Sequence, residues 1–390
     1  MTVDARAYGL AGDGTTDDRP APAALVDELG AARAADGLPR RILVPPGRYL
    51  IQDELQYVLR GRFCDLYVHD AAATGFGFDL AEHCGAQDPG EKMGGAGIGI
   101  GIGGWGDVER LTVTACTAIG NGTNGIFLEL QQARWTPPRG IRITACHAED
   151  NRFRISDWGA DGLLVANCTV IGNHEAGFDV SSQGTSGIGG RGGVVTGCVI
   201  DGNLRDGIGF GNTPGPYAIP GNRISDNGRR AAPAAAGGGD GVRCLARSVL
   251  DEHAGWPADG HRGKRVTVGG QSAVVLRNTA TALTLAPCRP GADTAWSDGT
   301  PPAGTAYRLP DSPAPRAGLT VAAPLTRPHV HGNRFWDDQE PRTHNHALWI
   351  TADGHWQGGR VTDNDFTGNA DRSTRYDAAP QGGRWRDNEG

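Results

Sequence analysis

The chain repeats one short pattern of apolar and polar positions. In each unit an apolar residue stands three positions before an anchor residue, a small or apolar residue stands two positions after it, and an Asn or Asp stands five positions after it. The anchors are Cys116, Cys146, Cys168, Cys198, Asn222, Asn333, Asn364 and Asn388. Apolar residues at alternate positions predict short strands, and Asn favours tight bends. The pattern predicts stacked coils of strand, bend and strand.

The positions around the anchors support this interpretation. The residues that stand three positions before the anchors are Val113, Ile143, Val165, Val195, Ile219, Val330, Val361 and Trp385. The residues that stand five positions after the anchors are Asn121, Asn151, Asn173, Asn203, Asn227, Asp338 and Asn369. Outside one long gap the anchors are 22, 24, 30 or 31 residues apart, which fits one three-sided coil plus loops. We therefore expect an all-β, right-handed parallel β-helix, a solenoid whose coils share one core.

The repeat also predicts the domain organisation. Residues 1–51 are expected to form an N-terminal cap with a helix near Ala23 to Ala35, together with the first coil, and residues 52–228 the β-helix. Residues 229–328 lack the repeat and predict an inserted linker and a small β module, before the C-terminal coils at 329–390. Within the insertion, residues 240–245 are expected to supply the second strand of the interrupted coil. The Gly97–Gly104 segment contains GxGxxG, but no helix pattern follows, so we interpret it as a coil strand.

The opening of the chain carries a family resemblance. The run Gly12-Asp-Gly-Thr-Thr-Asp-Asp18, the Ala/Leu-rich stretch after it and the strand Ile42–Ile51 resemble the N-terminal signature of the pectate-lyase-like superfamily. That superfamily includes pectate lyases, polygalacturonase-like enzymes and phage tailspikes, so the resemblance implies a parallel β-helix that cleaves, modifies or binds polysaccharides. The chain has neither Gly-His-Gly nor the pectate lyase Arg-x-Pro-x-x-Arg, so it departs from both pectin-degrading patterns.

The amino-acid composition limits the possible partners and cellular location of the protein. The 62 glycines and 38% apolar content suit short strands and tight turns, and the net charge of −7 gives no basic field for nucleic acid. No signal peptide and no apolar run of about 18 residues is present, so we expect a cytoplasmic protein without a membrane partner. The four cysteines at one repeat position are expected to be stacked core thiols and not disulfides.

Acidic residues supply the candidate catalytic groups. Asp157 and Asp179 both stand six positions after a bend Asn, which would stack them outward on neighbouring coils, with Glu129 nearby. Paired carboxylates can act as general acid and base, or hold Ca²⁺ against a uronate whose carboxylate pairs with Arg243. An alternative register, with Ile155 and Phe178 inward, would bury Asp157. The metal therefore stays undecided, with Ca²⁺ as one option and no cofactor certain.

Aromatic and histidine side chains are candidates for substrate binding. Phe127, Trp135 and Trp349 lie on or near the second strands, where they could stack on sugar rings. His344 and His346 form one of two His-x-His pairs that could bind substrate or a metal.

Three functions remain open at this point. The first is a carbohydrate-active enzyme, either a glycoside hydrolase, a polysaccharide lyase or an epimerase, acting on an oligo- or polysaccharide in a surface groove. The second is a non-catalytic glycan-binding or spike-like protein, which could be a trimer. The third is an intracellular isomerase or cyclase that acts on a small metabolite.

Overall fold

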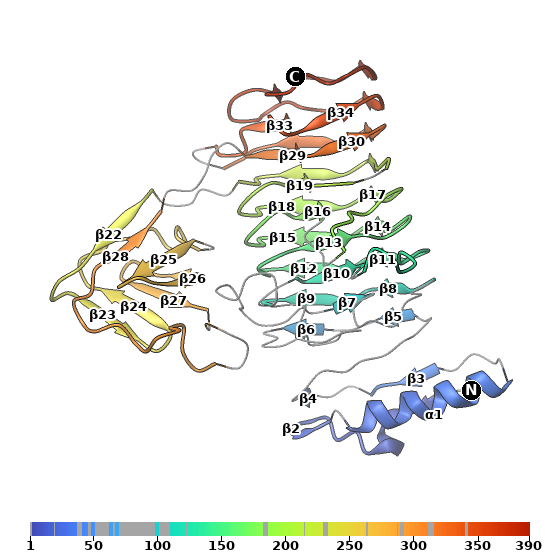
Figure 1. Cartoon of the computed structure of the whole chain (residues 1–390), viewed down its shortest axis with the longest axis horizontal. Coiled ribbons are helices and arrows are strands. Elements are labelled where there is room, and N and C mark those ends of the chain that lie inside the picture. The colour runs from blue at the N-terminus through green and yellow to red at the C-terminus, as the bar shows by residue number, and fades with distance from the viewer. Residues whose placement is uncertain are drawn as a thin grey trace.

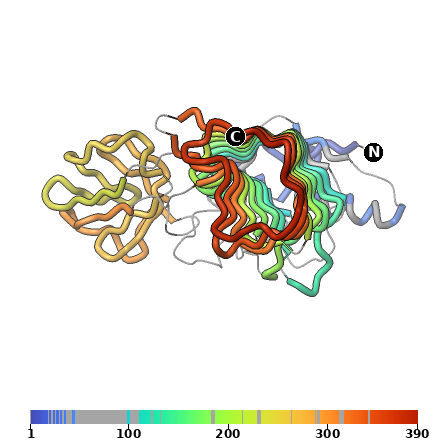
Figure 2. Tube along the Cα trace, turned by 90° about the horizontal axis from the view of Figure 1, so that it is seen from above, coloured from blue at the N-terminus to red at the C-terminus, as the bar shows by residue number. Residues whose placement is uncertain are grey.

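Stacked parallel strands dominate the structure (Figure 1). The computed structural model describes residues 2–18, 20–36, 41–45, 48–50, 62–64, 67–69, 98–100 and 110–390. The last range has gaps at 122–123, 131, 182–185, 214, 229–232, 263, 287, 289–291, 311–315 and 340–341. Viewed along the stack, successive coils superpose, and a separate β module lies to one side (Figure 2). The predicted all-β parallel β-helix is confirmed.

Three parallel sheets form the sides of the β-helix, here called sheets I, II and III in the order in which each coil meets them. Sheet I contains β5 (Arg62–Cys64), β8 (Thr112–Thr114), β11 (Arg142–Thr144), β14 (Leu164–Ala166), β17 (Val194–Thr196), β20 (Ala218–Pro220), β31 (His329–His331), β35 (Arg360–Thr362) and β37 (Arg384–Arg386). Sheet II contains β6 (Tyr67–His69), β9 (Thr117–Ile119), β12 (His147–Glu149), β15 (Thr169–Ile171), β18 (Val199–Asp201), β21 (Arg223–Ser225) and β32 (Arg334–Trp336).

Sheet III completes each coil. Its strands are β7 (Ile98–Ile100), β10 (Ile126–Glu129), β13 (Ile155–Trp158), β16 (Phe178–Val180), β19 (Ile208–Phe210), β29 (Ala317–Val321), β33 (His346–Ile350) and β36 (Thr374–Tyr376). Two further short strands, β30 (Pro324–Thr326) and β34 (His355–Gln357), pair between sheets III and I in the C-terminal coils. Strand β7 confirms the strand interpretation of the GxGxxG segment over Ile98–Ile100, while residues 101–109 lie outside the described residues.

Columns of identical side chains hold the bends together. Between sheets II and III, the buried amides of Asn121, Asn151, Asn173, Asn203 and Asn227 bond one to the next. Between sheets I and II, four buried free cysteines continue into a second amide ladder formed by Asn222, Asn333, Asn364 and Asn388. Such stacks satisfy polar groups inside the core without water.

The predicted bend column is wrong at its C-terminal end. Asp338 is exposed and its carboxylate accepts a hydrogen bond from the Trp336 indole, while its backbone N–H donates to Asp226. The side-chain amide of Asn369 donates to the backbone of Phe366. Among the described residues, the first ladder therefore ends at Asn227.

A separate unit precedes the coils. It contains β1 (Thr2–Asp4), the 3-10 helix η1 (Ala5–Tyr8), β2 (Asp13–Asp17), α1 (Pro20–Asp36), β3 (Arg41–Leu43) and β4 (Arg48–Leu50). Helix α1 confirms the predicted helix, and its Leu25 and Leu29 pack with Leu10. The Asp18 carboxylate accepts the backbone N–H groups of Ala11 and Gly12, which explains the acidic end of the opening motif. Residues 51–61, around the predicted boundary between the cap and the β-helix at residue 51, lie outside the described residues.

The insertion forms its own antiparallel β module. Its strands are β22 (Ala235–Gly237), β23 (Val242–Leu245), β24 (Ser248–Asp251), β25 (Arg265–Val268), β26 (Gln271–Asn278), β27 (Ala282–Leu285) and β28 (Tyr307–Leu309). They surround a core that includes Trp256, Trp296 and Tyr307 and is distinct from the β-helix core. The prediction for residues 240–245 is wrong, because β23 pairs with β24 in the module. The interrupted coil instead resumes at β29, so the β-helix returns at Ala317 and not at residue 329.

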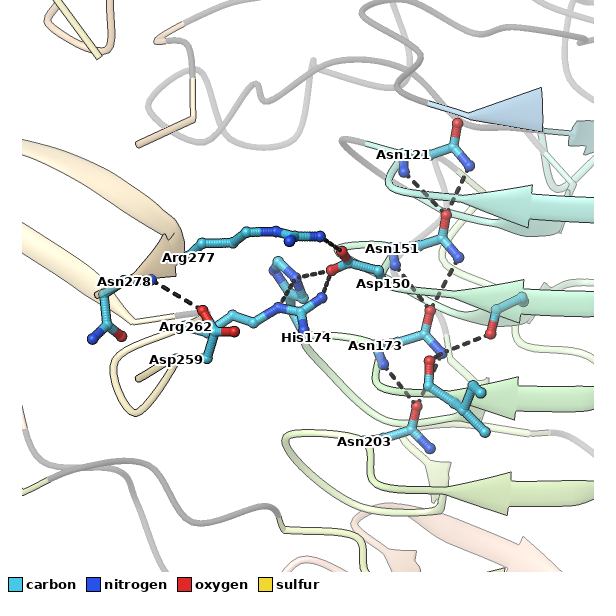
Figure 3. A network of polar contacts seen from close by, with 12 residues as sticks. Asn121, Asp150, Asn151, Asn173, His174, Asn203, Asp259, Arg262, Arg277 and Asn278 are labelled. Carbon is cyan, nitrogen blue, oxygen red and sulfur yellow. Dashed lines mark hydrogen bonds and ion pairs between the residues drawn. The ribbon is translucent and has the colours of Figure 1, made fainter. Parts of the chain in front are cut away.

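A polar network joins the module to the β-helix (Figure 3). From the module, Arg262 and Arg277 form ion pairs with Asp150, which follows β12 at a bend. Burial lowers the pKa of His174 to about 4, so its neutral ring accepts a hydrogen bond of 3.0 Å from Arg262 Nε. This network places the module beside the bends between sheets II and III.

Candidate functional site

The outward side chains of sheet III form the candidate site. Strand pairing aligns one outward position across the sheet, occupied in turn by Phe127, Ser156, Asp179, Gly209, Thr320, Trp349 and Arg375. The neighbouring positions point inward and carry apolar side chains such as Ile126, Ile155 and Phe178. Alternation along each strand therefore separates the core from this outer face.

A buried ion pair lies at the centre of the outer face. Arg154 Nε donates to Asp179 Oδ1 at 2.8 Å, and its Nη2 lies 2.6 Å from Oδ2. The two side chains are only 8% and 4% exposed. Beside them, the Asn124 amide donates to the Ser156 hydroxyl, which is fully buried. These polar side chains lie outside the β-helix core and yet are shielded from solvent.

Aromatic side chains flank this polar centre on both sides. Phe127 contacts Trp158, with ring centroids 5.6 Å apart, on the N-terminal side. Trp349 lies on the C-terminal side, where its indole N–H donates to Asp377 and Arg375 lies 5.1 Å from its ring centroid. Gly209, Trp349 and Arg375 are only partly buried, so the outer face opens toward its C-terminal half.

The predicted stacking of Asp157 on Asp179 is wrong. Asp157 pairs in register with Leu128 and Val180 and points inward, whereas Asp179 pairs with Ser156 and points outward. The reason is one residue at the bend, because Ile155 follows Asn151 by four positions and Phe178 follows Asn173 by five. The alternative register that buries Asp157 is the one observed.

Inside the core, hydrogen bonds hold the carboxylate of Asp157 in place. Its carboxylate accepts hydrogen bonds from the backbone N–H groups of Gly159 and Ala160 and from the Tyr217 hydroxyl, at 3.1, 2.8 and 2.7 Å. Burial raises the pKa of Asp157 to about 6. Because Asp157 points into the core, away from the outer face, it is not a candidate catalytic residue.

Three other predicted binding residues do not join the outer face. Arg243 is exposed on β23 of the module and pairs in register with Leu250, not with a coil. His344 and His346 are fully buried, and burial lowers the pKa of both rings. His346 belongs to the inward register of β33, since it aligns with Ala317. Their predicted contact with substrate is therefore wrong.

The remaining predicted residues lie on the outer face or near it. Phe127, Glu129, Asp179 and Trp349 point outward on sheet III, and the Glu129 side chain is 2% exposed. Trp135 is half-buried in the loop between β10 and β11. Within the described residues, no group of three or more His, Cys, Asp or Glu side chains could hold a metal ion, so the Ca²⁺ option gains no ligand set there.

Sequence reasoning missed Arg154, Ser156 and the outward direction of Trp158. All three follow from the shorter bend after Asn151, which shifts every side chain of β13 by one position. The signal is the placement of the apolar Ile155 one position earlier than its equivalents, which an alignment without gaps passes over.

Comparison with known proteins agrees with the observed fold. A family model described as "Right handed beta helix region" matches residues 97–247. With the observed strand pairing, this defines the chain as a right-handed parallel β-helix protein. The parallel β-helix that the resemblance implied is thereby confirmed.

Solved structures with similar coils have diverse activities. The A-module of mannuronan C-5 epimerase AlgE6 from Azotobacter vinelandii is 13% identical, with 99% of this chain and 98% of that chain covered and a TM-score of 0.38. The Streptococcus pneumoniae surface protein and adhesin PfbA is 11% identical, with coverage of 99% and 100% and a TM-score of 0.39. Pectate lyase Pel9A is 12% identical, with coverage of 90% and 71% and a TM-score of 0.34. A search of curated protein sequences found no match.

The described residues contain no helix with the length and apolar character needed to span a bilayer.

Proposed function

We propose that this protein is a carbohydrate-active enzyme that binds an oligo- or polysaccharide across the outer face of sheet III. The observation that carries the proposal is the Arg154–Asp179 ion pair, which is buried outside the core. Burying two charges is costly, and apolar residues of similar size would often give equal or higher stability. A desolvated, bidentate pair flanked by aromatic rings is typical of a site that binds or transforms a ligand.

The two outward acids suit hydrolysis through a water molecule. Glu129 aligns with Trp158, so it lies two strands away from Asp179 and two positions closer to the carboxyl end of the strands. From strand spacing and rise, their backbones are about 12 Å apart. When both side chains extend toward each other, their carboxyl groups come closer than the backbones. Their separation then fits the range of about 6.5 to 9.5 Å between the acid and base carboxyl groups of inverting glycosidases. We assign Asp179, paired with Arg154, as the base and Glu129 as the acid.

A specific observation favours a second candidate, non-catalytic glycan binding. The strands next to Asp179 present Ser156 and Gly209 at the same outward position, so no carboxylate directly neighbours it. With Asp157 in the core, the closely spaced acid pair of the sequence-based hypothesis does not exist. A glycan-binding face would need only the aromatic rings and the polar centre.

The test compares turnover and binding in matched variants. The wild-type chain is assayed on alginate, polygalacturonate and neutral glucans for new reducing ends and for unsaturated products. Asp179→Asn should lower turnover by about 100-fold or more while retaining the shape of the side chain. The control is Asp161→Asn, because Asp161 also pairs with an arginine, Arg191, but on an exposed surface.

A second variant separates catalysis from folding. Removing one member of a buried pair costs about 3 to 5 kcal/mol, so Asp179→Asn alone could lower activity by unfolding the protein. Replacing both partners, Arg154→Met with Asp179→Leu, should keep the thermal midpoint near that of wild type and still abolish turnover. Full turnover in either variant would contradict the assignment. Glycan binding by wild type without any turnover would establish the second candidate instead.

A further inference from the structure

The C-terminal end of sheet I presents an exposed cluster of arginine and histidine side chains. Strand pairing places Arg384 beside Arg360 and Arg360 beside His329, on three neighbouring coils. Two positions along, Arg386 and His331 lie on the same outward side. All five side chains are exposed. We refer to these five residues as the cationic face, and sheet I places it on a different side of the coil from the outer face of sheet III.

Among the described residues, most of these side chains have no acidic partner. Arg386 lies 3.2 Å from Asp387 in an exposed pair. In the part of the chain that the structure describes, no ion pair joins Arg360, Arg384 or His329 to a carboxylate. Like charges directly opposite each other on neighbouring strands, about 4.8 Å apart, destabilise a sheet. The stacked arginines therefore do not serve the stability of these coils.

The charge is local and not a property of the whole chain. On the three coils before His329, the position of Arg360 is occupied by Ala218, Val194 and Leu164, and these separate the stacked arginines from Arg142 on the coil before them. The chain as a whole has a net charge of −7. A compact positive face on an acidic protein is the arrangement that selects an anionic ligand, since the remaining surface repels it.

We propose that the cationic face is a second binding site, which takes an acidic polysaccharide. Guanidinium groups match the planar, two-oxygen geometry of carboxylates and sulfates. Arginines repeated from coil to coil suit a polymer that carries one anionic group on successive sugar units. The ligand class rests on the proposed function, because a carbohydrate-active enzyme gains from a second site that holds its polymer.

Nucleic acid and membrane are the less favoured ligands. Proteins that bind single-stranded nucleic acid place aromatic side chains beside the basic ones, and the outward positions of β31, β35 and β37 hold only His, Arg and Thr. These outward positions also carry no apolar side chain that could enter a lipid surface.

The experiment measures binding by the full chain, apart from turnover. The probes are polygalacturonate for carboxylates, chondroitin sulfate for sulfates, neutral dextran and a single-stranded DNA. The variant is Arg360→Ser with Arg384→Ser. The matched control is Arg142→Ser with Arg308→Ser, which removes the same charge from two other exposed strand arginines, one of them on sheet I at the position equivalent to Arg360.

The expected result is a loss of about tenfold or more in affinity for an acidic polysaccharide at about 20 mM salt, with the control unchanged. The comparison of carboxylated and sulfated probes identifies the anionic group. Unchanged affinity in the variant, equal binding of dextran, or tighter binding of DNA would each overturn the proposal. Asp179→Asn should leave this binding intact, so failure here and failure of the proposed catalytic site are distinguishable.

Discussion

At the scale of single residues, the buried carboxyl group of Asp157 has the clearest physical consequence. It accepts two backbone N–H groups that follow β13 and the hydroxyl of Tyr217 from a later coil, so it links the turn after β13 to the inside of the β-helix. Gly190 lies directly against this carboxylate, because a Cβ atom there would overlap it. The Asp157 carboxylate therefore connects three successive coils inside the β-helix.

The pKa of Asp157 predicts a pH-dependent stability. Burial raises that pKa to about 6, above the value of about 3.9 in an unfolded chain, so the folded state binds the proton more tightly. The stabilisation is present below about pH 4 and is lost as the pH rises through about 6, a change of about 3 kcal/mol. Asp157→Asn should remove this change, as measured by urea unfolding at several pH values. Identical pH profiles in wild type and variant would contradict this account, and Asp161→Asn is the exposed control.

At the scale of elements, the asparagine ladder shows how a bend is specified. Asn173 donates to Asn203 and to the backbone of Ala148, and its Oδ1 accepts from the backbone and side chain of Asn151. Asn227, at the end of the ladder, accepts from Asn203, and among the described residues it donates only to the backbone of Ile200. Both side chains are fully buried, so they differ in ladder position and not in exposure.

This difference predicts unequal effects of the same substitution. Asn173→Ala leaves polar groups unpaired on both neighbouring coils and should lower the free energy of unfolding by about 3 kcal/mol. Asn227→Ala leaves them unpaired on one side and should cost about half as much. Chemical unfolding of both variants checks the ratio. An equal or larger effect at Asn227 would show that the ladder does not act through contacts between coils.

At the scale of the whole molecule, the insertion interrupts the sequence of the β-helix but not its stack. Strand β19 pairs with β29 as directly as with β16, although the module separates β19 from β29 along the chain. A Cβ atom on Gly228 would overlap the Arg316 side chain, so the two ends of the insertion lie side by side. The module and the β-helix also have separate cores.

Removal of the module should therefore leave the β-helix folded. We expect a chain in which residues 234–310 are replaced by a short Gly/Ser linker to keep its β-sheet circular dichroism and a cooperative unfolding transition. The interactions lost from the β-helix should be those of Asp150 and His174 with the module. Hydrogen exchange should then rise at these two bends and remain unchanged on sheet I. Loss of the cooperative transition would show that the module is part of the folding unit.

The sequence by itself determined the repeating interior of this protein. Alternating apolar residues, the anchor column and the bend asparagines depend on local spacing, and each coil repeats the same contacts, so the fold and the bend column as far as Asn227 could be predicted. The outward direction of Asp179 was predicted for the same reason.

The tertiary structure decided the details of the outside. A bend that is one residue shorter turns Asp157 inward and brings Ser156 beside Asp179, because successive side chains of a strand face opposite sides. The pairing partner of β23 and the burial of His344 and His346 depend on loops and on the insertion, which carry no repeat. Only contacts between coils distant in sequence select among such alternatives, so only the structure could show which acid faces the solvent side of sheet III and which lies in the core.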